Sequence, residues 1–225
     1  MARRGGEEER VRDFLDYLDF RKGHIYDLAV EHVKIVLVAI AIATAISILI
    51  AILTYRSARI AAIVLGIQGA SLTVPSLALF GLLIPFVGLG YRPVLVALVI
   101  YALLPITRNT ITGLRGVDPA IIESAQGMGM GRLRRLFRIE LPLAWPVILT
   151  GIRVSTVMTL GIAAIGAYVN GPGLGEDIFA GLSRIGTPTA VHLALGGTLG
   201  VVVLAMLFDA FYVVVGKLTI SKGVR

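Results

Sequence analysis

Apolar residues dominate five long stretches of this chain, and most of the charged residues gather between them. The stretches cover residues 35–53, 60–87, 93–111, 147–169 and 190–215. A helix needs about 20 apolar residues to cross the hydrocarbon core of a bilayer. Strands of a membrane barrel alternate apolar and polar residues instead, whereas a helix satisfies its backbone within one continuous segment. The pattern therefore predicts an all-α integral membrane protein with about five transmembrane helices.

The second stretch carries Pro75 and Pro85 inside an otherwise continuous apolar run. Proline removes a backbone donor and its ring clashes with the preceding turn, so we expect two half-helices or a sharp kink near Pro75. A broken helix is tolerated in lipid only where protein covers it or where it lines a cavity. Two interpretations stay open, a segment of a translocation pathway and a proline kink filled by its neighbours. The candidate pathway residues are Ser71, Thr73, Pro75 and Ser76.

The first 32 residues are polar and mixed in charge, without the basic start and short apolar run of a secretory signal. Phe14, Leu15 and Leu18 recur at helical spacing among acidic residues. This spacing predicts a short amphipathic helix that lies on the membrane surface or caps the first span. The expected organisation is a polar segment over residues 1–32, a transmembrane domain over 33–217 and a cytoplasmic tail over 218–225.

Composition supports the membrane class and argues against a soluble domain or a disordered chain. Hydrophobic residues make up 56% of the sequence and charged residues 16%, against about 45–50% and about 25% in soluble proteins. The net charge is +7, and the densest basic segment lies within residues 115–138. Lysine and arginine favour cytoplasmic loops, which predicts an N-terminus outside and a C-terminus inside, despite the basic residues before the first span. The charge thus indicates a bilayer and a protein partner rather than nucleic acid.

Residues that could carry catalysis or hold a metal are scarce. The chain has no cysteine, and His24, His32 and His192 have no metal-ligand spacing, so we expect no metal site. No glycine-rich loop ending in Lys-Ser or Lys-Thr is present, so we expect this chain not to bind ATP itself. Asp209 is the one acid inside a predicted span, where an ion pair, a helix-packing role and a pathway role all stay open.

The loop between the third and fourth stretches carries the most informative pattern. Asp118 followed by Pro119 is typical of an N-cap and a first helical residue. An apolar stripe at helical spacing follows, and a series of three glycines ends the helix. The stripe is formed by Ile121, Ile122, Ala125 and Met128, and the glycines are Gly127, Gly129 and Gly131.

A second, basic helix is predicted to begin at Arg132, and Leu141–Pro142 is expected to close it before the fourth span. The two helices would form a hairpin on the cytoplasmic face, within a loop over residues 115–142. A basic amphipathic hairpin can anchor to the membrane surface, or it can lay an apolar face into a groove of a partner. The apolar face of the second helix comprises Leu133, Leu136, Phe137 and Ile139.

The residue spacing in this loop resembles the EAA signature of the permease subunits of ABC importers. The matching residues are Glu123–Ser124–Ala125, Gly129, Ile139 and Leu141–Pro142, with Ser124 in place of the first alanine. The resemblance covers about residues 30–220. It implies that the hairpin couples the permease to a separate ATP-binding subunit. The residues that it assigns to coupling are Asp118, Glu123, Ser124, Ala125, Gly129, Arg132, Ile139, Leu141 and Pro142.

Neighbouring segments are similar to the osmoprotectant branch of that family, whose members carry glycine betaine, choline, carnitine or proline. Permeases for methionine or another amino acid stay as an alternative, and so does a channel or membrane enzyme outside the ABC class. The similar segments are residues 73–79, 128–130 and 151–153, then 173–175 with Ile178, and Gly181–Leu182.

The resemblance also implies the cellular setting of the chain. It would be a transport subunit rather than an enzyme, without a catalytic residue or cofactor, because ATP and Mg²⁺ would be held by the partner. The implied partners are ATP-binding subunits, a second permease subunit, identical or paralogous, and an extracytoplasmic substrate-binding protein. The implied location is a bacterial or archaeal cytoplasmic membrane.

Overall fold

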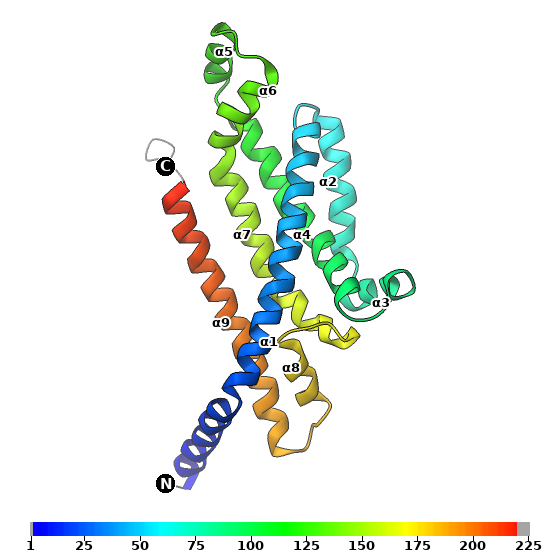
Figure 1. The fold of residues 1–225 in the computed structure, drawn as a ribbon, viewed down its shortest axis with the longest axis vertical. Helices are drawn as coiled ribbons and strands as arrows, with labels where there is room; N and C mark the ends of the chain where they lie inside the picture. Colours follow the sequence, from blue (N-terminus) through cyan, green and yellow to red (C-terminus); the bar gives the residue numbers. More distant parts are fainter. Residues whose placement is uncertain (1, 220–225) are drawn as a thin grey trace. The chain divides into compact units, whose positions relative to one another are not determined.

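The computed structural model describes the backbone of residues 2–219 and the side chains of residues 12–187 and 189–219. Over these residues the chain is helical and contains no strand (Figure 1). The long helices are α1 (Ala2–Thr54), α4 (Tyr91–Arg115), α7 (Leu141–Ile165) and α9 (Pro188–Thr219). The shorter elements are α2 (Ala58–Thr73), α3 (Ser76–Val87), α5 (Pro119–Gly127), α6 (Arg132–Arg135), the π-helical turn η1 (Leu136–Glu140), the 3-10 turn η2 (Gly166–Val169) and α8 (Gly175–Leu182).

The predicted all-α membrane class is confirmed. Within residues 2–219, four helical segments are long and apolar enough to cross a bilayer, and a fifth candidate appears if α2 and α3 count as one broken span. The four segments are α1, α4, α7 with its flanking turns, and α9. Of the expected tail, residues 220–225 lie outside the described part of the chain.

The sequence predicts a short, separate amphipathic helix near the N-terminus. In the structure this segment is instead the first part of α1. No proline occurs between residues 2 and 54, so no proline interrupts the helix. The rings of Phe14 and Tyr17 lie 5.9 and 5.5 Å from the ring of His192 on α9. The aromatic face of this segment therefore packs against protein.

The predicted break before Pro75 is confirmed. Val74, which follows α2, has an extended backbone with φ −74° and ψ 124°, and α3 begins at Ser76. The hydroxyl group of Tyr101 donates a 2.7 Å hydrogen bond to the carbonyl oxygen of Val74. A side chain of α4 thus satisfies a backbone group released by the interruption.

The helices form two compact units. The first comprises Met1–Val36, Ser76–Leu95 and Leu160–Met206. Its turn between η2 and α8 is tightly packed, because a Cβ built on Gly173 would lie 2.7 Å from the His32 ring and because Leu174 is fully buried. Asn170 in this turn adopts the left-handed conformation with φ 61°. The segment is therefore an ordered part of the first unit.

The second unit comprises Leu37–Pro75, Val96–Thr159 and Leu207–Arg225. Here α4 and α7 approach closely at glycines. A Cβ on Gly151 would lie 2.9 Å from the carbonyl oxygen of Pro105, and one on Gly113 would lie 3.0 Å from that of Ala144. In lipid no hydrophobic effect drives helices together, so they associate through close van der Waals packing. Small residues such as glycine permit this packing. This unit also carries the hairpin between α4 and α7.

Candidate functional site

The first arm of the hairpin, α5, begins where the sequence predicts. The Asp118 carboxylate accepts a 2.8 Å hydrogen bond from the backbone N–H of Ala120, and Pro119 is the first helical residue. Figure 1 shows α5 and α6 beyond the ends of α4 and α7. The N-cap therefore starts the arm directly after α4 ends.

The turn at the tip explains one glycine of the signature. Gly129 has φ +78°, a conformation that favours glycine. The N–H of Met130 donates to the carbonyl oxygen of Ala125 at 3.1 Å, and the N–H of Gly129 donates to that of Gln126 at 2.9 Å. This pair of hydrogen bonds is the Schellman arrangement at a helix C-terminus. The backbone conformation rather than lack of space thus requires Gly129, since a Cβ at this position would have no described atom within 4 Å.

The second arm differs from the prediction. Arg132 begins a helix that runs through α6 and η1 directly into α7, so the prediction that Leu141–Pro142 closes it is wrong. The N–H of Leu141 bonds to the carbonyl oxygen of Leu136, five residues back. In a regular α-helix the ring of Pro142 would clash with the carbonyl group of the preceding turn. The wider π turn shifts the hydrogen-bond register, so the helix continues past Pro142. The second arm and the membrane span are consequently one continuous helix.

Each apolar stripe of the hairpin has some side chains that are buried and others that are exposed to solvent. Ala125 and Leu136 are buried, Ile122 and Ile139 are half-buried, and the remaining apolar side chains are exposed beside charged residues. We call this exposed set the hairpin surface. It comprises Ile121, Glu123, Met128, Arg132, Leu133 and Phe137.

A buried carboxylate ties the base of the hairpin together. Glu140 is 1% exposed, and one of its oxygens lies 2.7 Å from Nε of the buried Arg135. The hydroxyl group of Tyr55 donates to the other oxygen at 2.7 Å. Arg56 lies 4.0 Å from the same carboxylate and donates to the Tyr55 hydroxyl at 2.8 Å. Glu140 therefore joins the second arm to the loop between α1 and α2.

A further arginine strengthens this junction. Nε of Arg115, at the end of α4, donates a 2.6 Å hydrogen bond to the carbonyl oxygen of Tyr55, and Nη2 donates to that of Ser57 at 3.3 Å. Burial, followed by the hydrogen bond to Glu140, raises the pKa of Tyr55 above its ordinary value. Tyr55 thus keeps its proton and remains the donor. We call Tyr55, Arg56, Arg115, Arg135 and Glu140 the base cluster.

The sequence interpretation missed the base cluster. It counted Arg135 among the arginines of the second, basic helix and assigned no role to Glu140. The available signal was a lone acid that follows a run of arginines and directly precedes an apolar span. A charge in that position needs a partner, because burial of an unpaired carboxylate is costly.

The predicted coupling residues fall into two groups. Asp118, Glu123 and Ser124 are exposed on or beside α5, Gly129 forms the tip, and Arg132 starts the second arm. Ala125 is buried between them. Ile139, Leu141 and Pro142 lie at the base, next to Glu140. The structure thus brings the signature together in one hairpin.

The candidate pathway residues lie around the break in the helix. The hydroxyl of Ser71 donates to the carbonyl oxygen of Ile67 at 3.3 Å, and that of Thr73 donates to Ala70 at 2.7 Å. Pro75 is exposed and Ser76 is half-buried. Both hydroxyls therefore point back to their own helix, and the pathway role stays a prediction.

Asp209 does form an ion pair, one of the roles that the sequence left open. Nε and Nη2 of Arg153 each donate to one of its oxygens, at 2.6 and 2.7 Å respectively. Arg153 lies midway along α7. The pair joins α7 to α9 within the second unit.

Comparisons with known proteins agree with this geometry. Residues 35–220 match the family described as "binding-protein-dependent transport system inner membrane component". The chain is 41% identical, over 80% of both chains, to the carnitine transport permease protein OpuCB of Listeria monocytogenes. It is 33% identical to the glycine betaine/carnitine/choline transport system permease protein OpuCB of Bacillus subtilis, over 96% of this chain and 97% of the relative.

A solved structure shares the fold. The inward-facing methionine ABC transporter MetNI superposes with a TM-score of 0.77 at 19% identity, over 87% of this chain and 95% of the other. At this identity the likeness concerns the fold alone. The resemblance drawn from the loop signature is confirmed by the family match and by the relatives.

Proposed function

Because the chain belongs to the family of binding-protein-dependent transport system inner membrane components, we propose that it is the permease of an ATP-driven importer of small osmoprotectants. Glycine betaine, choline, carnitine and proline are the substrates that we propose. As a member of the family the chain is a multi-pass membrane component of a transporter rather than an enzyme. The relatives named for carnitine and for glycine betaine, carnitine and choline support the substrate class.

The observation that carries the coupling role is the contrast between the tip and the base of the hairpin. At the tip, Met128 is 69% exposed, Leu133 72% and Phe137 63%. Apolar side chains of this size at a polar surface are typical of a docking site for another protein. At the base, Glu140 is fully paired. A hairpin that docks at its tip and is fixed at its base to a membrane helix can transmit movement of the partner subunit to that helix.

In this proposal the hairpin surface lies in a groove of an ATP-binding subunit. Glu123 and Arg132 set the register through charge, and the apolar side chains supply the contact area. Closure of two such subunits then moves the continuous helix that begins at Arg132. ATP and Mg²⁺ belong to the partner, and this chain holds neither.

The remaining partners and the orientation complete the proposal. A second permease subunit, identical or paralogous, and an extracytoplasmic substrate-binding protein join the complex. The hairpin faces the cytoplasm, which places the N-terminus outside and the C-terminus inside. The basic residues of the hairpin and the family description, which names dependence on a binding protein, support this arrangement.

Uptake measurements with the reconstituted complex test the proposal. We would combine the permease with ATP-binding subunits and candidate binding proteins in vesicles and measure ATP-dependent uptake of glycine betaine, choline, proline and methionine. Uptake of glycine betaine or choline is expected. Uptake of methionine without glycine betaine or choline would overturn the substrate class.

A pair of variants tests the coupling role. Leu133→Asp places a charge on the hairpin surface and is expected to lower uptake and substrate-stimulated ATP hydrolysis at least about tenfold, because it opposes apolar docking. Phe20→Asp is the control, since Phe20 is 89% exposed on α1. Equal uptake by both variants would contradict docking through this surface.

A further inference from the structure

The Arg153–Asp209 ion pair lies in a place where isolated charges are rare. Both residues are inside helices that are long and apolar enough to span a membrane, and their side chains are 40% and 45% exposed. Charged side chains within spans almost always face the bundle interior or an aqueous cavity, because contact with acyl chains is strongly unfavourable. The exposed side of this pair therefore faces water or another subunit.

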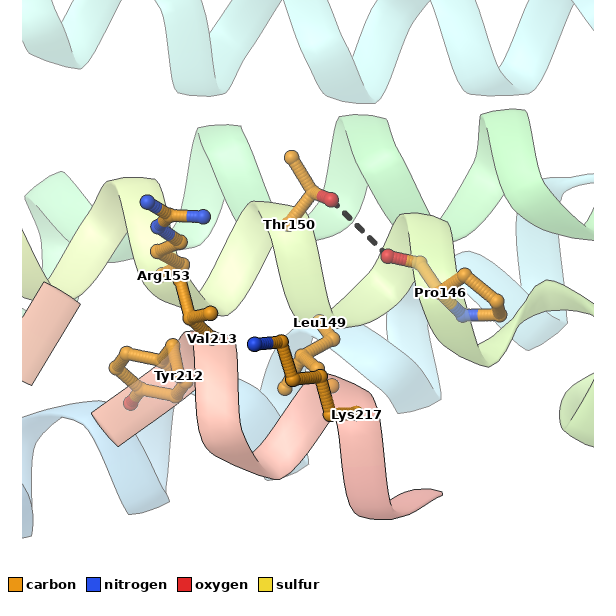
Figure 2. A pocket seen from close by; sticks show the side chains of 8 residues that line it. Pro146, Leu149, Thr150, Arg153, Tyr212, Val213 and Lys217 are labelled. Atoms are coloured by element: carbon orange, nitrogen blue, oxygen red, sulfur yellow. Dashed lines mark hydrogen bonds between the residues drawn. The ribbon is translucent and has the colours of Figure 1, made fainter. Parts of the chain in front are cut away.

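A small cavity opens beside the pair. Its volume is about 290 Å³. Sites for drug-sized ligands begin near 300 Å³, so this cavity suits a smaller molecule. Figure 2 shows Arg153 and Tyr212 toward one end of the cavity and Pro146 at the other. The lining residues are Pro146, Leu149, Thr150, Arg153, Tyr212, Val213, Gly216 and Lys217.

Two cationic side chains, Arg153 and Lys217, line the cavity, and Asp209 is bonded to Arg153 without being one of the lining residues. The guanidinium group of Arg153 already binds both oxygens of one carboxylate, at 2.6 and 2.7 Å, which shows that its fork is oriented for carboxylates. The Asp209 carboxylate and the aromatic ring of Tyr212 both attract a quaternary ammonium group. The Tyr212 hydroxyl lies 2.9 Å from that of Thr156, which fixes the ring.

We propose that the Arg153–Asp209 pair is a transit site for zwitterionic osmolytes, in which Arg153 takes the substrate carboxylate and Asp209, with the Tyr212 ring, takes the quaternary ammonium group. The proposal rests on the proposed function and names the residues that recognise the substrate in this chain. Binding opens one ion pair and forms two, so the charges remain balanced. Such an exchange keeps the site weak, as passage through a membrane protein requires.

Choline separates this role from a purely structural one. Choline carries the quaternary ammonium group but has no carboxylate, so it engages Asp209 without Arg153. A structural ion pair, in contrast, supports every substrate equally. The ratio of glycine betaine uptake to choline uptake therefore reports on recognition rather than on folding.

The experiment uses the complete reconstituted transporter with a binding protein that delivers both substrates. Arg153→Gln is expected to lower the ratio of glycine betaine uptake to choline uptake by about tenfold, because a charged hydrogen-bonded pair with the substrate is lost. Asp209→Asn is expected to lower the uptake of both substrates. Arg153→Lys keeps the charge without the fork and should give an intermediate ratio. Arg108→Gln, which removes an arginine outside the cavity, is the control and should leave the ratio unchanged.

An unchanged ratio in Arg153→Gln, with both uptakes reduced in parallel, would overturn the transit site and leave the proposed function standing. If Arg153→Gln fails to assemble, the ratio for Arg153→Lys decides in the same way. A wild-type complex that takes up neither substrate would instead refute the proposed function, and the transit site with it.

Discussion

The hydroxyl group of Tyr55 donates a 2.7 Å hydrogen bond to the buried carboxylate of Glu140, across 85 positions of the sequence. This contact fixes the loop after α1 to the π turn at which the hairpin meets α7. Arg135 neutralises the same carboxylate from within the second arm. The hairpin is therefore held at its base by a buried polar junction within the second unit.

Removal of Glu140 should destabilise the protein strongly. Glu140→Ala leaves the buried Arg135 without its carboxylate, and breaking a buried pair in this way costs about 3–5 kcal/mol. Thermal unfolding of the purified chain measures the loss. Arg138→Ala, at an exposed position of the same turn, is the control and should change stability little. A double Arg135→Met and Glu140→Leu variant should recover most of the loss, since both buried charges are removed together and the remaining arginine near the site, Arg56, is exposed to solvent.

Substitution of the tip glycine should impair coupling without disturbing the spans. Gly129→Ala forces a side chain into φ +78°, which costs about 1–2 kcal/mol and shifts the turn away from its native form. Gly131→Ala is matched to it, because Gly131 has φ −66° and open space around its Cβ position. We expect ATP-dependent uptake to fall several-fold in the first variant only. Identical uptake in both would show that the left-handed turn is dispensable.

The close approach of α4 and α7 should make Gly151 sensitive to a single methyl group. In Gly151→Ala the new Cβ would lie 2.8 Å from Cβ of Asn109 and 2.9 Å from the Pro105 carbonyl oxygen. Overpacking of this kind costs about 1–3 kcal/mol. Gly161→Ala on the same helix meets no atom within 4 Å and should be neutral. Melting temperatures of the two variants in one detergent provide the comparison, and equal values would argue against tight packing here.

Stability should depend on pH through Glu176 in the first unit. Burial, then the nearby charge of Glu31, raises the pKa of Glu176 above its ordinary value, while His24 lowers it. A raised folded-state pKa means that ionisation opposes folding, so stability is full at acidic pH and declines as the pH rises through that pKa. Glu176→Gln should therefore melt at a higher temperature than the wild type at pH 7. The difference should vanish below about pH 4, and a difference that persists there would contradict this cause.

The sequence predicts the features that are local. Continuous apolar runs identify the spans, Asp118–Pro119 identifies the start of α5, and the glycine series identifies its end. Each of these follows from backbone chemistry within a few residues. The pattern also places the break before Pro75, because the effect of proline on the preceding turn is local.

The features that it does not predict depend on contacts distant in sequence. Leu141–Pro142 suggests a helix end, and only the π turn that shifts the hydrogen-bond register allows the helix to continue. The sequence does not show that Tyr55 binds Glu140 or that Arg153, among many arginines, binds Asp209. These side chains come near their partners only after the helices pack. The sequence also does not show which apolar side chains of the hairpin stay exposed, because this depends on how the two arms pack against each other.

The shortness of α5 has a consequence for the order of assembly. A nine-residue helix is marginal in water by itself, so α5 relies on Ala125 and on the second arm to stay folded. The second arm in turn exists as the extension of α7. We therefore expect the hairpin surface to form only after α7 has entered the bilayer, so that a partner which recognises this surface selects permeases whose insertion is complete.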